Sequence, residues 1–287
     1  MSGSARGAVA PPAPLTDMAG RFAAFSFVDR IDAHAEGAPV RGRYTIPATA
    51  GRFPPSLAAE AVGQLAAWVA MRRLGFRVRP VAGLAGETRY GSAFGPGDTL
   101  DLEVDLEAAT DTDVAYHGRA SVGGQTVLTL ERALGPMLPA DEFDDPAALA
   151  RDFATLAGPG APPGRFDGVP PPRLELDAGA TRPGERAAGR LAIPTDAPYF
   201  ADHFPRKPVY PATLLMEALS TLASIAAGGR ARVSGMQDVK VRQFMPPGAT
   251  LEVSATVASD GGGWSGRVAA RLDGKPAATA KVLLEAA

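Results

Sequence analysis

Two kinds of side chain in this sequence could carry acid–base chemistry: a histidine in a proline-rich loop, and glutamates in otherwise apolar stretches. His203 stands in such a loop, and an imidazole can accept a proton there because its ordinary pKa lies near neutrality. Glu60 and Glu217 are each the single carboxylate of a long apolar run. A carboxyl group in apolar surroundings keeps its proton more readily than one in water. The sequence therefore contains the parts of an acid–base pair.

Composition narrows this chemistry further. The chain of 287 residues has no cysteine, which excludes disulfides, thiolate nucleophiles and cysteine-ligated metals. Its three histidines, His34, His117 and His203, show no metal-binding spacing, so we expect no metal and no other cofactor. We expect His34 in an exposed turn and His117 on the face of a strand.

Charge and hydropathy indicate where the chain works. It has 29 Lys and Arg against 31 Asp and Glu, so no charge excess points to nucleic acid or to a membrane surface. No window approaches the roughly 20 apolar residues of a membrane span. Residues 1–18 are rich in Ala, Pro and Gly and lack the apolar core of a signal peptide. We therefore expect a cytoplasmic protein whose leader, residues 1–18, is disordered.

The two glutamates lie at matching places in an internal repeat. Residues 42–47 (Gly-Arg-Tyr-Thr-Ile-Pro) match residues 189–194 (Gly-Arg-Leu-Ala-Ile-Pro). After each match comes a proline-led apolar run, over residues 56–71 and 213–227, and glycine follows each run. Both runs are apolar nearly all round, so we expect two helices that other structure wraps.

Strands should follow each helix. Apolar and polar residues alternate over 100–107 and over 251–257, the pattern of a sheet with one wet face. Turn residues recur at 96–98 and 247–249, and again at 123–124 and 273–274. This order predicts an α+β fold in two similar domains, residues 19–147 and 171–287. Residues 148–170 are rich in Pro and Gly and should link them, with a short helix near 147–157.

The segment 199–218 resembles the signature of the 3-hydroxyacyl-acyl-carrier-protein dehydratases of fatty acid synthesis. That signature runs Phe-Phe-x-Gly-His-Phe-Pro-x-x-Pro-Val-x-Pro-Gly-x-Leu-x-x-Glu-Ala, and the match is ungapped. The resemblance implies the hotdog fold, a long helix wrapped in an antiparallel sheet, with two units packed side by side. We therefore expect a tandem (double) hotdog, a pseudo-dimer within one chain.

The resemblance also implies a reaction, the removal of water from 3-hydroxyacyl thioesters. Such dehydration needs a base for the proton on C2, an acid for the C3 hydroxyl and donors that polarise the thioester carbonyl. His203 is the expected base, and the N–H groups near Ala212 and Thr213 are the expected donors. Phe204 and Pro211 should border the substrate.

The acid is expected to be Glu60, because in this family the histidine loop of one unit reaches the helix of its neighbour. From Pro47 to Glu60 is 13 positions and from Pro194 to Glu217 is 23, so the first half lacks about ten residues where its own histidine loop would be. The first half keeps Gln64 one turn after its glutamate. We expect one composite site of His203, Glu60 and Gln64, and a vestigial site at Glu217.

Two departures from the signature keep alternatives open. Ala212 stands where the family has glycine, and Ala201-Asp202 replaces x-Gly before the histidine, adding bulk beside the base. A non-catalytic acyl-carrier-binding subunit, a hotdog thioesterase and a hotdog isomerase are the alternatives. The expected partner is an acyl carrier protein or coenzyme A that carries the acyl chain. Chain length, a fatty acid or polyketide-type pathway, and monomer or homodimer stay open.

Overall fold

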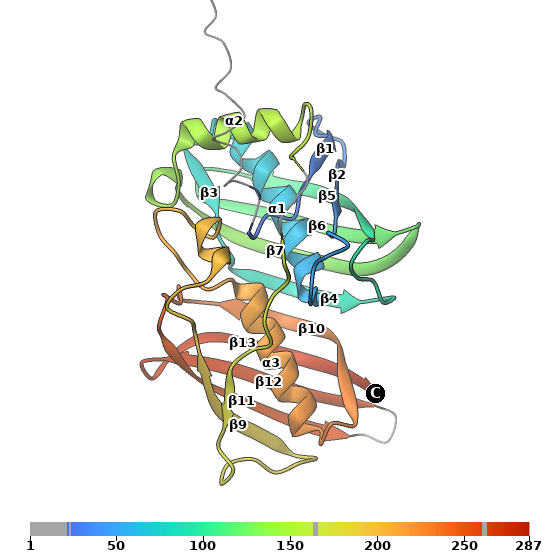
Figure 1. Cartoon of the computed structure of the whole chain (residues 1–287), viewed down its shortest axis with the longest axis vertical. Coiled ribbons are helices and arrows are strands. Elements are labelled where there is room, and N and C mark those ends of the chain that lie inside the picture. The colour runs from blue at the N-terminus through green and yellow to red at the C-terminus, as the bar shows by residue number, and fades with distance from the viewer. Residues whose placement is uncertain (1–21, 23, 163–165, 260–262, 287) are drawn as a thin grey trace, which may run out of the picture.

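A single antiparallel sheet and three α-helices make up the computed structural model, which describes residues 22, 24–162, 166–259 and 263–286. Helices α1 (Ser56–Arg73) and α3 (Ala212–Ala226) lie one above the other on the same side of the sheet, and α2 (Pro146–Leu156) crosses the upper end (Figure 1). The predicted leader, residues 1–18, lies outside the described residues. No helix of the described part is long and apolar enough to cross a membrane.

The strands divide between the halves of the chain. The first half holds β1 (Arg30–Ala33), β2 (Val40–Thr45), β3 (Val78–Pro80), β4 (Leu84–Tyr90), β5 (Thr99–Ala109), β6 (Asp113–Val122) and β7 (Gln125–Pro139). The second half holds β8 (Leu174–Leu176), β9 (Arg186–Ala192), β10 (Ala231–Val241), β11 (Thr250–Ser259), β12 (Trp264–Leu272) and β13 (Lys275–Ala286). Their order in the sheet is β1-β2-β5-β6-β7-β4-β10-β13-β12-β11-β9-β8, with β3 beside β7.

Proline and glycine set the helix ends, as the sequence predicts. Pro55 and Pro211 stand at the N-caps of α1 and α3, where a missing N–H costs nothing. After α1 the chain turns at Gly75 with φ +63°, and after α3 at Gly228 with φ +71°. Glycine adopts these left-handed angles without steric cost, so it ends the helices.

The predicted strands and turns are also confirmed. Leu251 and Val253 of β11 are buried while Glu252 between them is exposed, which gives the sheet one dry and one wet face. The two-residue turns at 123–124 and 273–274 have positive φ throughout. Such turns match the right-handed twist of the strands that they join. The short helix predicted near 147–157 is α2, which spans Pro146–Leu156.

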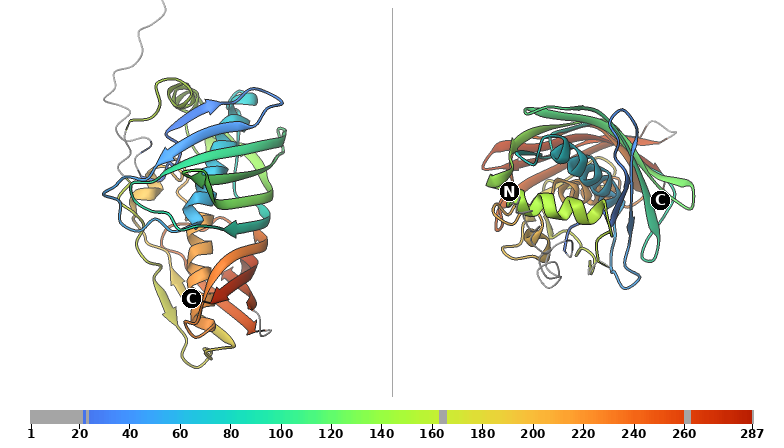
Figure 2. Two further views of the ribbon diagram at one scale, coloured as in Figure 1. Left: turned by 90° about the vertical axis from the view of Figure 1, so that its right-hand side faces the viewer. Right: turned by 90° about the horizontal axis from the view of Figure 1, so that it is seen from above.

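The two halves share one sheet because β4 pairs with β10. The pairing is antiparallel and runs from Arg89 opposite Gly235 to Leu84 opposite Lys240. Seen from above, the sheet curves around the helices (Figure 2). The junction is tight, since a Cβ on Gly235 would lie 2.7 Å from the Thr88 carbonyl oxygen. The strands beside α1 and those beside α3 therefore form one continuous sheet.

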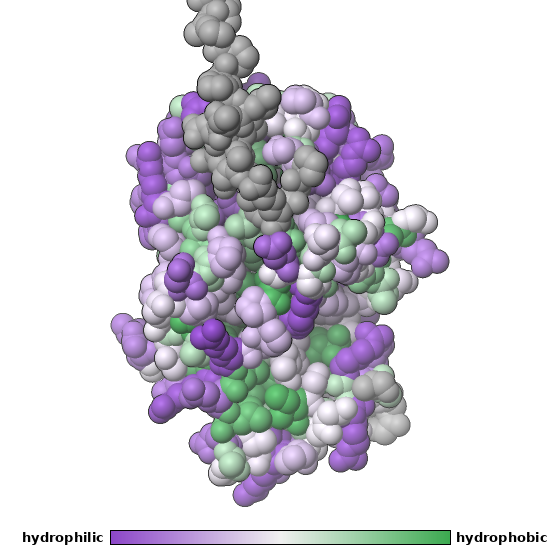
Figure 3. Space-filling view, in the orientation of Figure 1, coloured by the Kyte–Doolittle hydropathy of each residue, from purple (hydrophilic) through white to green (hydrophobic). Residues whose placement is uncertain are grey.

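The segment between the halves packs on the first half. Phe153 of α2 contacts the ring of Phe76, and Phe166 contacts the rings of Phe27 and Phe53. In the described residues the second half has no counterpart of α2 over α3. In the orientation of Figure 1 the second half lies below, and apolar side chains gather on its surface (Figure 3). Each half thus has sheet strands and a central helix, but among the described residues only the first half has a further helix packed against it.

Truncating a core leucine in either half should destabilise the whole chain. Leu65 of α1 and Leu222 of α3 are both 0% exposed and occupy equivalent places, with the spacing that separates Glu60 from Glu217. Leu65→Ala and Leu222→Ala should each cost about 2–5 kcal/mol. Because the halves share one sheet, calorimetry should show one transition, lowered in both variants. Two separate transitions, each moved by only one substitution, would contradict this.

Candidate functional site

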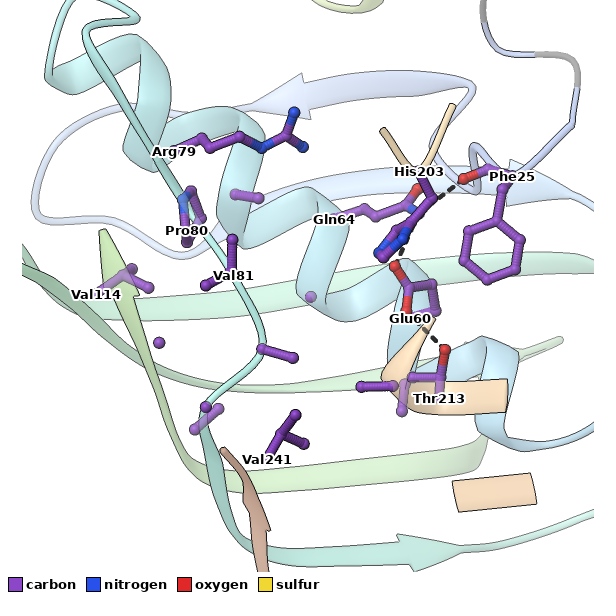
Figure 4. A pocket seen from close by; sticks show the side chains of 18 of the residues that line it. Phe25, Glu60, Gln64, Arg79, Pro80, Val81, Val114, His203, Thr213 and Val241 are labelled. Atoms are coloured by element: carbon purple, nitrogen blue, oxygen red, sulfur yellow. Dashed lines mark hydrogen bonds between the residues drawn. The ribbon is translucent and has the colours of Figure 1, made fainter. Parts of the chain in front are cut away.

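A cavity of about 280 Å³ lies where the two halves meet. One wall is α1 with Glu60 and Gln64, and another is the loop before α3 with His203. The segment 79–85, which includes the end of β3 and the start of β4, closes the opposite side. The His203 ring and the Glu60 carboxylate face the same space, across from Pro80 and Val81 (Figure 4). The structure therefore brings together the histidine and the glutamate that the sequence pairs across the repeat.

The His203 ring is fixed by one hydrogen bond and two ring contacts. Its Nδ1 lies 3.0 Å from the carbonyl oxygen of Val209. A carbonyl oxygen only accepts, so Nδ1 must carry the hydrogen and donate it. In the neutral ring this leaves the lone pair on Nε2. Phe204 stacks on the ring at 4.1 Å and Phe25 meets it edge-on at 5.6 Å, which holds the ring plane.

Burial lowers the pKa of His203 below its ordinary value of 6.5. The negative charge of Glu60 and the hydrogen bond to Val209 oppose this effect, and the positive charge of Arg79 adds to it. Burial dominates because a charged imidazolium loses its hydration in the cavity. His203 is therefore neutral at neutral pH, the form that can accept a proton.

Glu60 is held at both oxygens. Gln64 Nε2 donates to Oε1 at 3.0 Å, and Thr213 Oγ1 donates to Oε2 at 2.7 Å. Thr213 lies in the first turn of α3, so this second bond joins the two halves. Among the described residues no Lys or Arg forms an ion pair with Glu60. A carboxyl group that accepts these two hydrogen bonds still has a lone-pair direction open, where it can carry a proton.

The Gln64 amide is oriented by the backbone of the segment that precedes β1. Its Oε1 accepts from the Phe27 N–H at 2.8 Å, and its Nε2 donates to the Phe25 carbonyl at 2.9 Å. These two bonds distinguish oxygen from nitrogen, because an N–H must meet an acceptor and a carbonyl must meet a donor. Gln64 therefore presents only N–H to Glu60.

The start of α3 contributes backbone to the cavity. Ala212, Thr213 and Phe204 line the cavity. Pro211 does not line it, and its carbonyl oxygen accepts hydrogen bonds from the N–H groups of Leu214 and Leu215. The N–H groups of the first two residues of a helix come before its first internal hydrogen bond, and α3 has no side-chain cap to accept from them. Ala212 is not among the residues with positive φ. Alanine therefore replaces the glycine of the signature without backbone strain.

Glu217 has a different environment on the equivalent face of α3. Arg52 forms an ion pair with its Oε1, and Ser56 Oγ lies 3.5 Å from its Oε2. Thr221, which stands where the first half has Gln64, donates to the Glu217 backbone carbonyl and not to its carboxylate. Glu217 does not line the cavity. The structure thus places a guanidinium beside Glu217 and an imidazole near Glu60.

Sequence reasoning missed four residues around these carboxylates. Phe25 and Arg52 carry no motif signal, and the signature indicates only added bulk at Asp202. Tyr116 lines the cavity, and burial, with the Glu60 charge as a second cause, raises the pKa of its phenol. The alternation of β6 gives the only signal for Tyr116, because an inward residue of that strand faces α1.

The other two histidines lie apart from the cavity. His34 is exposed before a turn, as expected, with its ring 5.4 Å from that of Phe153. His117 stands on β6 between Asp105 and Glu107, at 3.2 and 3.3 Å, on the wet face that the sequence predicts. Within the described ranges no group of three or more His, Asp or Glu side chains could hold a metal ion.

Comparison with known proteins places this chain in a family. The profile of ApeI-like proteins, described as ApeI dehydratase, matches residues 180–272. The 3-hydroxyacyl-acyl-carrier-protein dehydratase FabZ of Roseiflexus sp. (strain RS-1) is 36% identical over 28% of this chain and 57% of its own length. FabZ of Acetivibrio thermocellus is 32% identical over 35% of this chain and 74% of its own. The chain thus spans little more than half of the first relative.

Solved structures support the fold over most of the chain. A putative oleoyl thioesterase from Lactobacillus plantarum has a TM-score of 0.58 at 12% identity, covering 88% of this chain and 98% of its own. A putative thioesterase II from Thermobifida fusca has the same TM-score at 13% identity, covering 93% and 97%. At such identities the likeness shows the hotdog fold alone. With the dehydratase relatives above, it follows that this chain belongs to the FabZ and ApeI-like family of hotdog dehydratases.

Proposed function

We propose that this protein is a hydro-lyase that removes water from 3-hydroxyacyl thioesters. The observation that carries the proposal is the pair His203 and Glu60, which face one cavity from opposite halves of the chain (Figure 4). One member is a neutral imidazole with a free Nε2, and the other is a carboxyl group held by two donors. Elimination of water needs such a base and such an acid on either side of the C2–C3 bond.

In the proposed reaction His203 Nε2 takes the proton from C2 of the acyl chain. Glu60 gives its proton to the C3 hydroxyl, the C–O bond breaks, and water leaves as the C2–C3 double bond forms. The N–H groups at the start of α3, near Ala212 and Thr213, polarise the thioester carbonyl as C2 loses its proton. Gln64 and Thr213 hold the Glu60 carboxyl in place. Proton transfer from His203 back to Glu60 restores the resting state.

The substrate is proposed to reach this cavity on a phosphopantetheine arm, carried by an acyl carrier protein or by coenzyme A. The FabZ relatives act on acyl-carrier-protein substrates by name, and the ordinary setting of the reaction is fatty acid or polyketide-type synthesis. Phe204 stacks on the His203 ring and borders the acyl thioester. The reaction as proposed uses no metal and no redox cofactor.

The architecture that we propose is a tandem hotdog with one composite site. Residues 19–147 and 171–287 are the two units, and 148–170 link them. The two central helices, each followed by its own strands, support this division. The shared sheet and the bond from Thr213 to Glu60 support the single composite site. Glu217, neutralised by Arg52, is the remnant of a second site.

A non-catalytic acyl-carrier-binding subunit is the second candidate. The observation that favours it is the methyl group of Ala212, which lines the cavity where the signature has glycine. Such a subunit would bind the thioester but would not exchange the C2 proton. Mass spectrometry after incubation in deuterated water separates the two candidates, because only a dehydratase incorporates deuterium at C2.

Three substitutions test the composite site. His203→Ala removes the base and Glu60→Gln the acid, so each should lower the rate of dehydration of a 3-hydroxyacyl thioester about 10²–10⁴-fold. Glu217→Gln is the matched control, because it makes the same change at the equivalent position of α3, outside the cavity. It should keep the rate within about threefold. The measurement is the formation of the unsaturated thioester by mass spectrometry.

The reverse pattern decides against this assignment. If Glu217→Gln stopped the reaction while Glu60→Gln did not, the pairing across the halves would be wrong. Circular dichroism of each variant separates a lost proton donor from a lost fold.

The pH dependence follows from the lowered pKa of His203. The base must be neutral, and its folded pKa lies below the ordinary 6.5. As pH falls through 6.5, kcat/KM should therefore hold and should decline only at lower pH. A pH profile on a short 3-hydroxyacyl thioester measures the acid limb. A midpoint at or above 6.5 would contradict burial as the dominant influence on His203.

A further inference from the structure

Asp202 ties the histidine loop to a segment from the other end of the chain. Its Oδ2 accepts from the N–H groups of Ala24 and Phe25, at 2.9 and 2.8 Å. We call residues 24–27 the strap. Both bonds are charge-assisted, and they span 178 and 177 positions of sequence. A glycine at position 202, as in the signature, could make neither bond.

The strap in turn holds the side chain of Gln64, which donates to Glu60. The Phe25 carbonyl accepts from Gln64 Nε2, and the Phe27 N–H donates to Gln64 Oε1. Gln64 then donates to Glu60. A continuous chain of hydrogen bonds therefore runs from the residue next to His203, through the strap, to the carboxyl of Glu60.

The strap also touches the base. The Phe25 ring, 2% exposed, meets the His203 ring edge-on at 5.6 Å. The ring is further packed by Phe27 and Tyr199, at 4.8 and 6.0 Å, so it cannot turn aside without disturbing that cluster. One backbone segment thus sets the place of both members of the proposed acid–base pair.

We propose that Asp202 is a positioning residue, which sets the His203 and Glu60 side chains against each other by anchoring the strap. The proposal rests on the proposed function only for its catalytic consequence. Without the Asp202 carboxylate the strap loses two anchors, the Gln64 amide loses its fixed backbone partners, and the Phe25 ring is no longer pressed on the imidazole. The substrate would still bind, but the two groups would no longer be held in register.

Three variants of the full chain test the proposal. Asp202→Ala removes both bonds, Asp202→Asn keeps an acceptor oxygen without the charge, and Asp196→Ala makes the same change at an exposed aspartate of the same loop. Amide hydrogen exchange at Ala24 and Phe25 reports the strap, and the NMR signals of the His203 ring report the pair. Steady-state kinetics on a 3-hydroxyacyl thioester separates kcat from KM.

In Asp202→Ala we expect exchange at both amides to speed up about tenfold or more, the His203 signals to shift, and kcat to fall about tenfold with KM little changed. Asp202→Asn should recover most of kcat, and Asp196→Ala should match the wild type. Fast exchange with unchanged His203 signals and unchanged kcat would overturn the proposal. Should the wild type prove inactive, the proposed function fails, and the exchange and ring signals still decide whether Asp202 positions the pair.

Discussion

The hydrogen-bond ladder between β4 and β10 is the constraint on which the rest of this structure depends. It joins two similar halves into one sheet and sets α1 beside α3, so that side chains from each half can reach the same cavity. His203 belongs to one half, and Glu60 and Gln64 to the other. Glu217, the helix carboxylate of the half that holds His203, does not line this cavity. The chemistry proposed here is therefore a property of the junction, and of the register that the ladder imposes on it.

A polar site inside an apolar junction needs partners for every buried group. Each buried donor or acceptor without a partner lowers the free energy of unfolding. A buried network in which only some groups have partners is less stable than an apolar core. The site meets this demand largely with main-chain groups: the Val209 carbonyl for His203, and the strap for Gln64 and Asp202. Backbone partners hold angles more firmly than flexible side chains do. The same bonds that stabilise the junction thus also orient the reactive groups.

The site uses both side-chain and backbone groups, and this explains which of its features the sequence could predict. Helix ends follow from Pro55, Pro211 and the glycines after each helix, and strands follow from their alternation. The candidate pair follows from what the resemblance of residues 199–218 implies, and the shorter spacing before Glu60 supports it. The strap was not predictable, because its hydrogen bonds use backbone N–H and C=O groups, which almost every residue has. The hydrogen bonds of Asp202 were not predictable either, because its partners are backbone N–H groups that lie 177 and 178 positions away in the sequence. Patterns in sequence report side chains, and here the backbone completes the site.

The difference between Glu60 and Glu217 comes from what approaches each carboxylate, because the scaffold beneath them repeats. Thr213 reaches Glu60 as Ser56 reaches Glu217, from equivalent places on the opposite helix. Beside Glu60 stands an imidazole, which can be neutral and accept a proton. Beside Glu217 stands Arg52, whose guanidinium keeps its charge at any ordinary pH. The Glu217 side chain is only 15% exposed, and Arg52 supplies the charge partner that such a carboxylate needs, so the ion pair gives this glutamate a structural role.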